Sequence, residues 1–129
     1  MSLLQIVRLL FESLLGLLSA YTAYSLFAWT PPSIAKAREA LHYPHWYWVL
    51  AGCLATIGAF SLFVGLFFPV IGVLAAAWMI AYFLVATFTH LLRKDFAGFV
   101  MPLIFLVLPL GLLVLRWADL TSILAALGR

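Results

Sequence analysis

The sequence predicts an all-α integral membrane protein, a four-helix bundle with a short interfacial helix in its first loop. Its 129 residues are 67% hydrophobic and only 9% charged, whereas soluble domains are about 45–50% apolar. The apolar residues also gather in runs of about 20, which as helices cross a bilayer core of about 30 Å. We expect a single transmembrane domain over residues 1–129, with helices at about 3–28, 46–67, 70–92 and 99–115.

The first predicted helix, residues 3–28, is the only one with charges embedded in its apolar run. Helical spacing places a polar stripe on one face: Arg8, Glu12, Ser19 and Thr22. A charge in the bilayer interior costs about 2.5–3.5 kcal/mol or more, so such side chains tend to be paired and to face other helices or a wet cavity. Arg8 and Glu12 are spaced to pair on one helix face. Two interpretations stay open: Arg8 reaches the headgroups and Glu12 neutralises it, or Glu12 lines a ligand or proton site.

Pro31 and Pro32 end the first helix, because proline lacks the backbone N–H that a helix interior requires. Residues 33–41 can then form a short helix along the membrane interface. Aromatic residues crowd the start of the second predicted span: Tyr43, Trp46, Tyr47 and Trp48. An aromatic belt at the bilayer boundary explains them, and an aromatic ligand cage is the alternative.

The second and third predicted helices form a hairpin closed by Phe68 and Pro69, so their far ends lie on one side of the membrane. Small residues recur at helical spacing in the second helix: Ala51, Ala55, Gly58, Leu62 and Gly65. A matching row follows in the third: Gly72, Ala76, Met79, Phe83, Ala86 and His90. Such seams let helix backbones approach closely in lipid, within this chain or against a second copy or another membrane protein. They place His90 on the packed face, with Tyr82 beside it.

The last part of the chain combines a fourth span with an amphipathic segment. Pro102 and Pro109 each remove a hydrogen bond from the helix predicted over residues 99–115, so we expect a kink. Residues 116–127 have an amphipathic pattern and either cover the surface or extend this helix. Basic residues occur on both sides of a chain that crosses four times, so the positive-inside rule does not choose an orientation.

Several function classes find little support in the sequence. The net charge of +3 comes from scattered residues, which form no basic stripe for nucleic acid. The single cysteine, Cys53, excludes an intrachain disulfide or a two-thiol redox centre. His42, His45 and His90 could approach one another, but loop histidines at an interface are usually solvated, so we expect no metal site. Spacing singles out no Ser-His-acid or Cys-His arrangement, which favours a non-enzymatic role.

The remaining polar groups suggest a small pocket inside the bundle. Its candidate lining residues are Arg8, Glu12, Ser19, Thr22, Tyr82, His90 and Arg93. The spacing of His90 and Arg93 lets imidazole and guanidinium share a face where the third helix leaves the membrane. In the alternative, Arg93 and Lys94 are membrane anchors and Asp95 caps the turn. Inward polar groups without a complete catalytic set favour binding of an apolar molecule such as a quinone or a lipid.

Short motifs occur in order along nearly the whole chain: Leu41-His42-Tyr43-Pro44 with Trp46, Ala51-Gly52 with Gly58, Leu66-Phe67-Phe68-Pro69, and Thr89-His90-Leu91-Leu92-Arg93-Lys94-Asp95. In these motifs the chain resembles the DoxX-like family of small four-helix membrane proteins. The resemblance implies a multi-pass bundle, usually in the bacterial cytoplasmic membrane. Some relatives are linked with quinone-coupled sulfur oxidation or redox-stress complexes. Family members often carry an acidic residue near Ala55 and a lysine near Ser25, and both are absent here.

We therefore expect an accessory or ligand-binding protein of the lipid bilayer, with quinone as the cofactor to consider. The first alternative is a membrane subunit of a quinone-linked oxidoreductase. Its redox chemistry would need a partner or a bound cofactor, because Cys53 alone cannot run a dithiol cycle. The second alternative is an assembly partner for another membrane protein, or a homo-oligomer, formed through the Gly/Ala seams.

Overall fold

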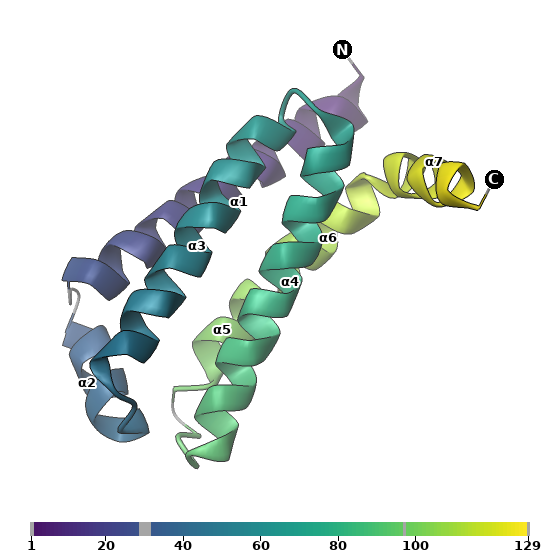
Figure 1. The fold of residues 1–129 in the computed structure, drawn as a ribbon. Helices are drawn as coiled ribbons and strands as arrows, with labels where there is room; N and C mark the ends of the chain where they lie inside the picture. The colour runs from purple at the N-terminus through teal and green to yellow at the C-terminus, as the bar shows by residue number, and fades with distance from the viewer. Residues whose placement is uncertain (1, 29–31, 97, 129) are drawn as a thin grey trace.

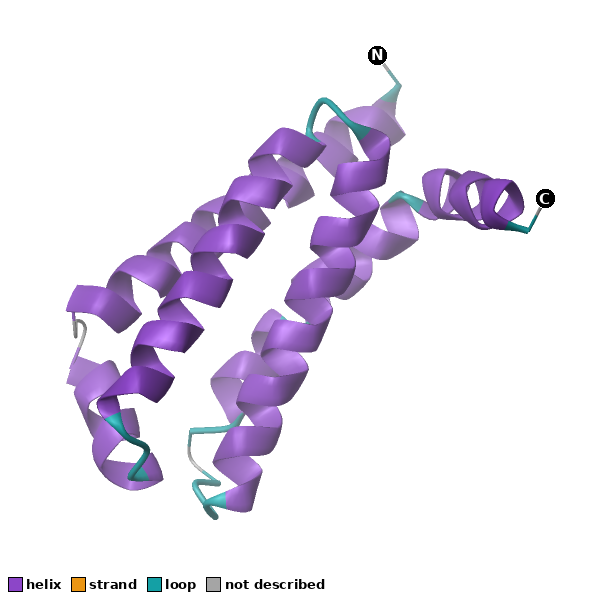
Figure 2. Ribbon diagram, in the orientation of Figure 1, coloured by secondary structure: helices purple, strands orange, loops and turns teal. Residues whose placement is uncertain are grey.

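The computed structural model describes residues 2–28, 32–96 and 98–128, and the regular structure within these ranges is helical throughout (Figures 1 and 2). In chain order the helices are α1 (Leu3–Ala28), α2 (Pro32–Leu41), α3 (His45–Gly65), α4 (Pro69–Leu92), α5 (Val100–Phe105), α6 (Val107–Leu115) and α7 (Trp117–Leu127). The predicted all-α fold class is confirmed. The predicted end of the first helix at Pro31 lies outside the described residues.

Four helical segments pack in a closed ring, in which α1 contacts α3, α3 contacts α4, α4 contacts α6, and α6 contacts α1. Helix α5 continues the last segment beside α4. Figure 1 shows the α3–α4 turn and α7 at one end of this ring, and α2 with the α4–α5 connection at the other. We call these the turn end (residues 66–68 and 116–119) and the loop end (α2 and residues 93–99).

Three helices, α1, α3 and α4, are long and apolar enough to span a membrane. A fourth span is counted if residues 100–115 and α7, which meet at a bend of 66°, are taken as one broken helix. Large apolar side chains are exposed along the outside of these helices, among them Leu14, Phe60, Leu74 and Phe88. An apolar exterior of this extent is expected where lipid rather than water surrounds a protein.

The single helix predicted over residues 99–115 is interrupted at Leu106, between α5 and α6. Pro109 explains the break, because it has no N–H for the carbonyl of Phe105 and its ring crowds that carbonyl. Pro102 lies in the first turn of α5, where a missing N–H leaves no helical hydrogen bond unmade. The expected proline kink therefore has one cause rather than two.

Helices α3 and α4 meet most closely beside their turn, where both backbones are glycine. A Cβ on Gly65 would lie 2.6 Å from the Cα of Gly72, so neither position has room for a larger side chain. Farther along, the seam residues are buried inside this chain, among them Ala55, Leu62, Ala76 and Met79. These seam residues therefore pack helix against helix within the chain.

The buried apolar residues form two clusters. The larger one joins α1, α3, α4 and α6 through Leu15, Leu62, Ala75, Ala76, Met79, Phe83 and Leu112. The smaller one consists of Leu26, Leu41 and Trp48, and it fastens the short α2 to α1 and α3. Among the side chains that the structure describes, Leu41 thus joins α2 to the bundle against Leu26 and the aromatic start of α3.

Candidate functional site

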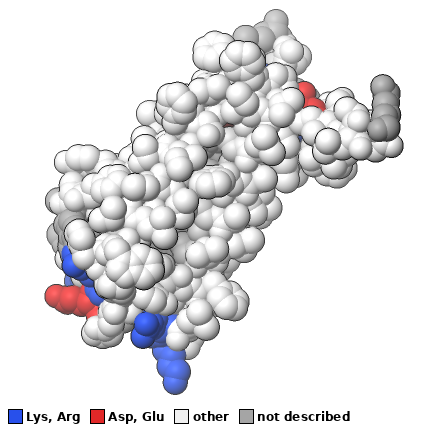
Figure 3. Space-filling view, in the orientation of Figure 1, with Lys and Arg blue, Asp and Glu red and all other residues white. Residues whose placement is uncertain are grey.

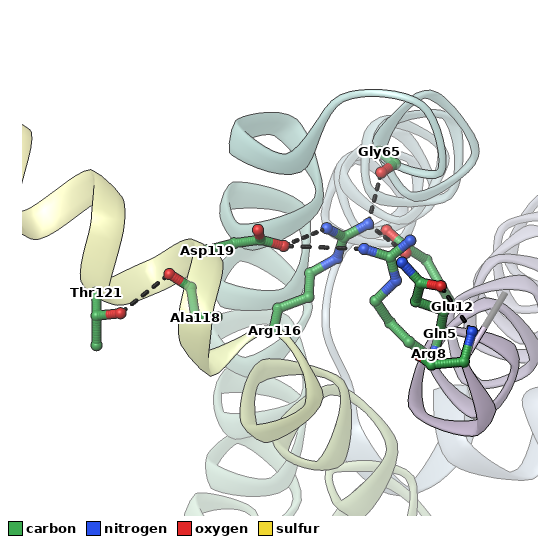
Figure 4. Close-up of polar contacts among 9 residues, drawn as sticks. Gln5, Arg8, Glu12, Gly65, Arg116, Ala118, Asp119 and Thr121 are labelled. Carbon is green, nitrogen blue, oxygen red and sulfur yellow. Dashed lines mark hydrogen bonds and ion pairs between the residues drawn. The ribbon is translucent and has the colours of Figure 1, made fainter.

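Four charged side chains meet at the turn end, two basic and two acidic (Figure 4). The guanidinium of Arg116, only 1% exposed, donates from Nη2 to Oε2 of Glu12 at 2.6 Å and from Nη1 to Oδ2 of Asp119 at 2.9 Å. Nη1 of Arg8 lies 3.9 Å from the same Asp119 oxygen. The cluster joins α1 to the start of α7, and its opposite charges balance.

Arg116 also completes the end of α3. Its Nη2 donates to the carbonyl oxygen of Gly65 at 2.6 Å. Gly65 is the last residue of α3, where backbone carbonyls lack helical partners and the helix dipole favours a cation. The guanidinium lies against the backbone of Gly72, where any Cβ would overlap it. The glycines at the turn thus create the space that a buried arginine needs.

The expected partner of Glu12 was Arg8 on the same helix, and the structure gives it a different one. Glu12 is fully buried and bonds Arg116, which follows it by 104 residues, while Arg8 approaches Asp119. The reason is that α6 ends beside α1 and the α3–α4 turn, so the residue after α6 points into the bundle. Arg116 and Asp119 belong to the amphipathic segment that the sequence predicts either to cover the surface or to extend the fourth helix. One sequence signal could have indicated the cluster. Arg116 and Asp119 are three residues apart, and they follow the fourth predicted span at the end of the bundle where Glu12 lies.

The hydroxyl groups of the polar stripe bond within α1 itself. Ser19 Oγ donates to the carbonyl of Leu15 at 2.8 Å, and Thr22 Oγ1 donates to the carbonyl of Leu18 at 2.9 Å. Ser19 is buried, so this bond removes the cost of an unpaired hydroxyl in the core. Each hydroxyl thus uses its one donor within the helix, without a ligand.

His90 and Arg93 lie at the loop end and have separate partners. Nδ1 of His90 is 2.8 Å from Oδ2 of Asp95, whose Oδ1 accepts the N–H of Gly98 at 3.1 Å. The guanidinium carbon of Arg93 lies 4.5 Å from the ring centre of Tyr43. Asp95 thus closes the turn after α4 and orients the imidazole.

The predicted pocket residues are therefore spread along the molecule. From Gly72, beside the buried cluster, to His90 is about 27 Å along α4 at 1.5 Å per residue, so Glu12 and His90 do not share one cavity. Within the described ranges, no group of three His, Cys, Asp or Glu side chains could hold a metal ion.

An apolar groove of about 300 Å³ runs between α3 and α4. It is lined by Tyr47, Leu50, Ala51 and Leu54 from α3 and by Trp78, Ala81, Tyr82, Val85 and Ala86 from α4. The Tyr82 hydroxyl donates to the carbonyl of Ala51 at 3.2 Å, and Trp78 Nε1 donates to the carbonyl of Leu54 at 3.0 Å. Of the predicted pocket residues, Tyr82 lines this groove. Tyr47, Ala51 and Ala86 were singled out in the sequence for other reasons, as interfacial aromatic and seam residues. The apolar side chains of Leu50, Leu54, Ala81 and Val85 carry no chemical signature of a site.

The chain can now be compared with known proteins. The sequence model of the DoxX-like family matches residues 10–112. This chain belongs to the DoxX-like family. The matched range contains Glu12, the groove and His90, whereas Arg116 and Asp119 follow it. Neither a curated protein nor a solved structure matches the chain significantly.

Two family positions named above are uncharged and buried in this structure. Ser25 and Ala55, where family members often carry a lysine and an acidic residue, are 2% and 0% exposed. Within the described part of the chain, the Ser25 hydroxyl has no hydrogen-bond partner. The buried charges of this DoxX-like protein are those of the Arg116 cluster instead.

Proposed function

We propose that this DoxX-like membrane protein is a non-enzymatic, ligand-binding protein of the bacterial cytoplasmic membrane that holds a lipid-like apolar molecule between α3 and α4. The observation that carries the proposal is the groove of about 300 Å³. Small-molecule sites commonly occupy about 300–1,000 Å³ and are mostly apolar with a few placed polar groups. A quinone ring or an acyl chain is apolar and would therefore pack against this apolar lining.

Fixed aromatic walls support the proposal. Trp78 and Tyr82 project from α4 and donate hydrogen bonds to backbone carbonyls of α3. Because these bonds hold the rings in place before a ligand arrives, little side-chain entropy remains to be lost on binding. The groove between them would then accept an apolar molecule without rearrangement of the helices.

Native mass spectrometry of the protein, released from membranes in a mild detergent, tests the proposal. Ala81 is an exposed lining residue, so Ala81→Phe fills the groove without entering the core. Ala77→Phe is the matched control, because Ala77 is exposed on α4 and does not line the groove. We expect wild type and Ala77→Phe to retain the same apolar molecule and Ala81→Phe to lose most of it. A wild type that retains nothing, or an Ala81→Phe variant that retains as much, would contradict the proposal.

A quinone-linked oxidoreductase subunit is the second candidate, and the His90–Asp95 pair favours it. A carboxylate bonded to Nδ1 orients the ring and leaves Nε2 for proton exchange with a bound quinone. The electrons would come from a sulfur donor through a partner or a bound cofactor, because Cys53 is a single thiol. This candidate predicts quinone reduction in native membranes that His90→Ala lowers and His42→Ala does not. Equal rates in both variants would exclude the role of His90.

A further inference from the structure

The α3–α4 groove leads to a basic side chain at the loop end. Tyr47 lines the groove and stacks on Tyr43 with ring centres 4.3 Å apart, and Arg93 lies over the ring of Tyr43. The wall of the groove therefore continues through two tyrosine rings to a guanidinium. A guanidinium stacked on an aromatic face keeps its N–H donors directed around its edge, where an anion can accept them.

Arg93 has no carboxylate partner among the described residues. The ion pairs of that part of the chain involve Arg8, Arg116 and His90 as the basic members. Asp95, the acidic residue nearest in sequence, is bonded to His90 and to the N–H of Gly98. Arg93 is exposed, so its charge is available to an external anion.

The surroundings of Arg93 are basic. Figure 3 shows the Lys and Arg side chains of the visible face gathered at the loop end, with most of the remaining surface uncharged. The sequence of this region has more basic than acidic residues: Lys36, Arg38, Arg93 and Lys94 against Glu39 and Asp95. The local field therefore favours an anionic group over a neutral or cationic one.

The near part of the groove lies within reach of a lipid chain that descends from a phosphate at Arg93. Arg93 directly follows the last residue of α4, where the span leaves the membrane. The lining residues from Ala86 back to Trp78 lie about 10–22 Å from Arg93 along the helix axis at 1.5 Å per residue. One leaflet of a bilayer core is about 15 Å deep, so an acyl chain anchored at Arg93 would enter the groove beside Ala86 and lie along the half of it that is nearer to Arg93.

We propose that the groove ligand is an anionic phospholipid, whose acyl chain lies between α3 and α4 and whose phosphate-containing headgroup is bound by Arg93. The proposal rests on the ligand-binding function proposed above and specifies its ligand class. A neutral quinone would fill the same groove but would make no use of the cation. Selectivity for a negative headgroup therefore distinguishes the two ligands.

Lipid titration of the delipidated protein in detergent, read by native mass spectrometry, tests this ligand class. The probes are phosphatidylglycerol and phosphatidylcholine with identical acyl chains. We expect the wild type to bind phosphatidylglycerol about tenfold more tightly, because the choline ammonium of phosphatidylcholine offsets the phosphate charge that attracts the guanidinium, whereas the glycerol headgroup leaves it uncompensated. Arg93→Gln should reduce this preference to less than about twofold, while Lys94→Gln, the matched loss of a neighbouring exposed charge, should leave most of it.

Two further measurements keep the test decisive if Arg93→Gln folds poorly. Arg93→Lys keeps the charge and should keep a preference for phosphatidylglycerol, and added salt should weaken the preference of the wild type by screening. Ala81→Phe should weaken binding of both lipids. An unchanged preference in Arg93→Gln, or wild-type retention of a quinone instead of phospholipid, overturns the phospholipid proposal and leaves the groove function standing. Lipid binding that Ala81→Phe does not weaken overturns both proposals.

Discussion

At the turn end Arg116 is buried against Glu12 and Asp119, whereas at the loop end Arg93 is exposed and lies over the ring of Tyr43. The two arginines belong to the same small bundle, and each directly follows the last residue of a helix, α6 for Arg116 and α4 for Arg93. Their partners differ: Arg116 bonds two carboxylates and the carbonyl of Gly65, whereas Arg93 lies over the ring of Tyr43 and has no carboxylate partner among the residues that the structure describes. We infer that one end holds the bundle together and the other remains free to bind.

The largest expected effect is the loss of the buried cation. Arg116→Met leaves Glu12 buried without its partner, which should lower the free energy of unfolding by about 3–5 kcal/mol. Unfolding in mixed detergent micelles, followed by tryptophan fluorescence, measures this change. Adding Glu12→Gln should recover part of the loss, because the uncompensated charge is then removed. Arg93→Gln, the corresponding change at the loop end, should stay within about 0.5 kcal/mol of wild type. Equal losses of unfolding free energy in Arg116→Met and Arg93→Gln would contradict the inference that the turn end, rather than the loop end, holds the bundle together.

The second prediction concerns the space beside Gly72, which the guanidinium of Arg116 occupies. Gly72→Ala places a methyl group where the Arg116 guanidinium lies, and overpacking of this kind should cost about 1–3 kcal/mol. Gly128→Ala is the control, since a Cβ there meets only backbone oxygens at 3.5 and 3.8 Å, which is ordinary contact. The same unfolding measurement compares them. A Gly72→Ala variant as stable as Gly128→Ala would show that the guanidinium is not tightly enclosed.

A smaller effect is expected for the hydrogen-bonded turn of the loop end. Asp95→Ala removes the partner of His90 and the acceptor of the Gly98 N–H, so it should cost about 0.5–1.5 kcal/mol. Glu39→Ala, at an exposed carboxylate of α2, provides the control in the same unfolding assay. A cost comparable to that of Arg116→Met would mean that the loop end is as important for stability as the turn end.

The smallest effect should come from Asp119→Asn. The Asp119 side chain is 30% exposed, and Arg116 keeps Glu12 and the Gly65 carbonyl when this charge is removed. A partly exposed ion pair of this kind contributes about 0.2–1 kcal/mol and is weakened by salt. Unfolding at low and high salt should therefore show a small difference from wild type that shrinks as salt is added. A larger loss of stability in Asp119→Asn would mean that Asp119 contributes substantially to keeping Arg116 in its buried position.

The fold could be predicted because its determinants are local in sequence. Apolar runs, a proline-closed hairpin and glycine seams each depend on residues within a few helical turns, and the all-α class and the DoxX-like family were both confirmed. The interruption of the helix predicted over residues 99–115 follows from Pro109, although its position at Leu106 required the structure.

The charged cluster and the groove were harder to predict from the sequence, because they depend on which helix ends lie next to each other. Glu12 was expected to face inward, but its partner Arg116 depends on how α6 ends against the α3–α4 turn. The groove arises where α3 and α4 separate from their glycine contact and aromatic side chains bridge the distance. Leu50, Ala81 and Val85 are apolar residue types that occur throughout membrane helices, so they do not indicate a groove.

The bond between Glu12 and Arg116 also sets an order of events in biosynthesis. Glu12 is made 104 residues before its counter-charge, which at about 5–20 residues per second is a delay of about 5–20 seconds. During that interval α1 carries a carboxylate whose final partner does not yet exist. Docking of the last segment neutralises the carboxylate and caps α3 in one step. Completion of the bundle is thereby coupled to the synthesis of Arg116.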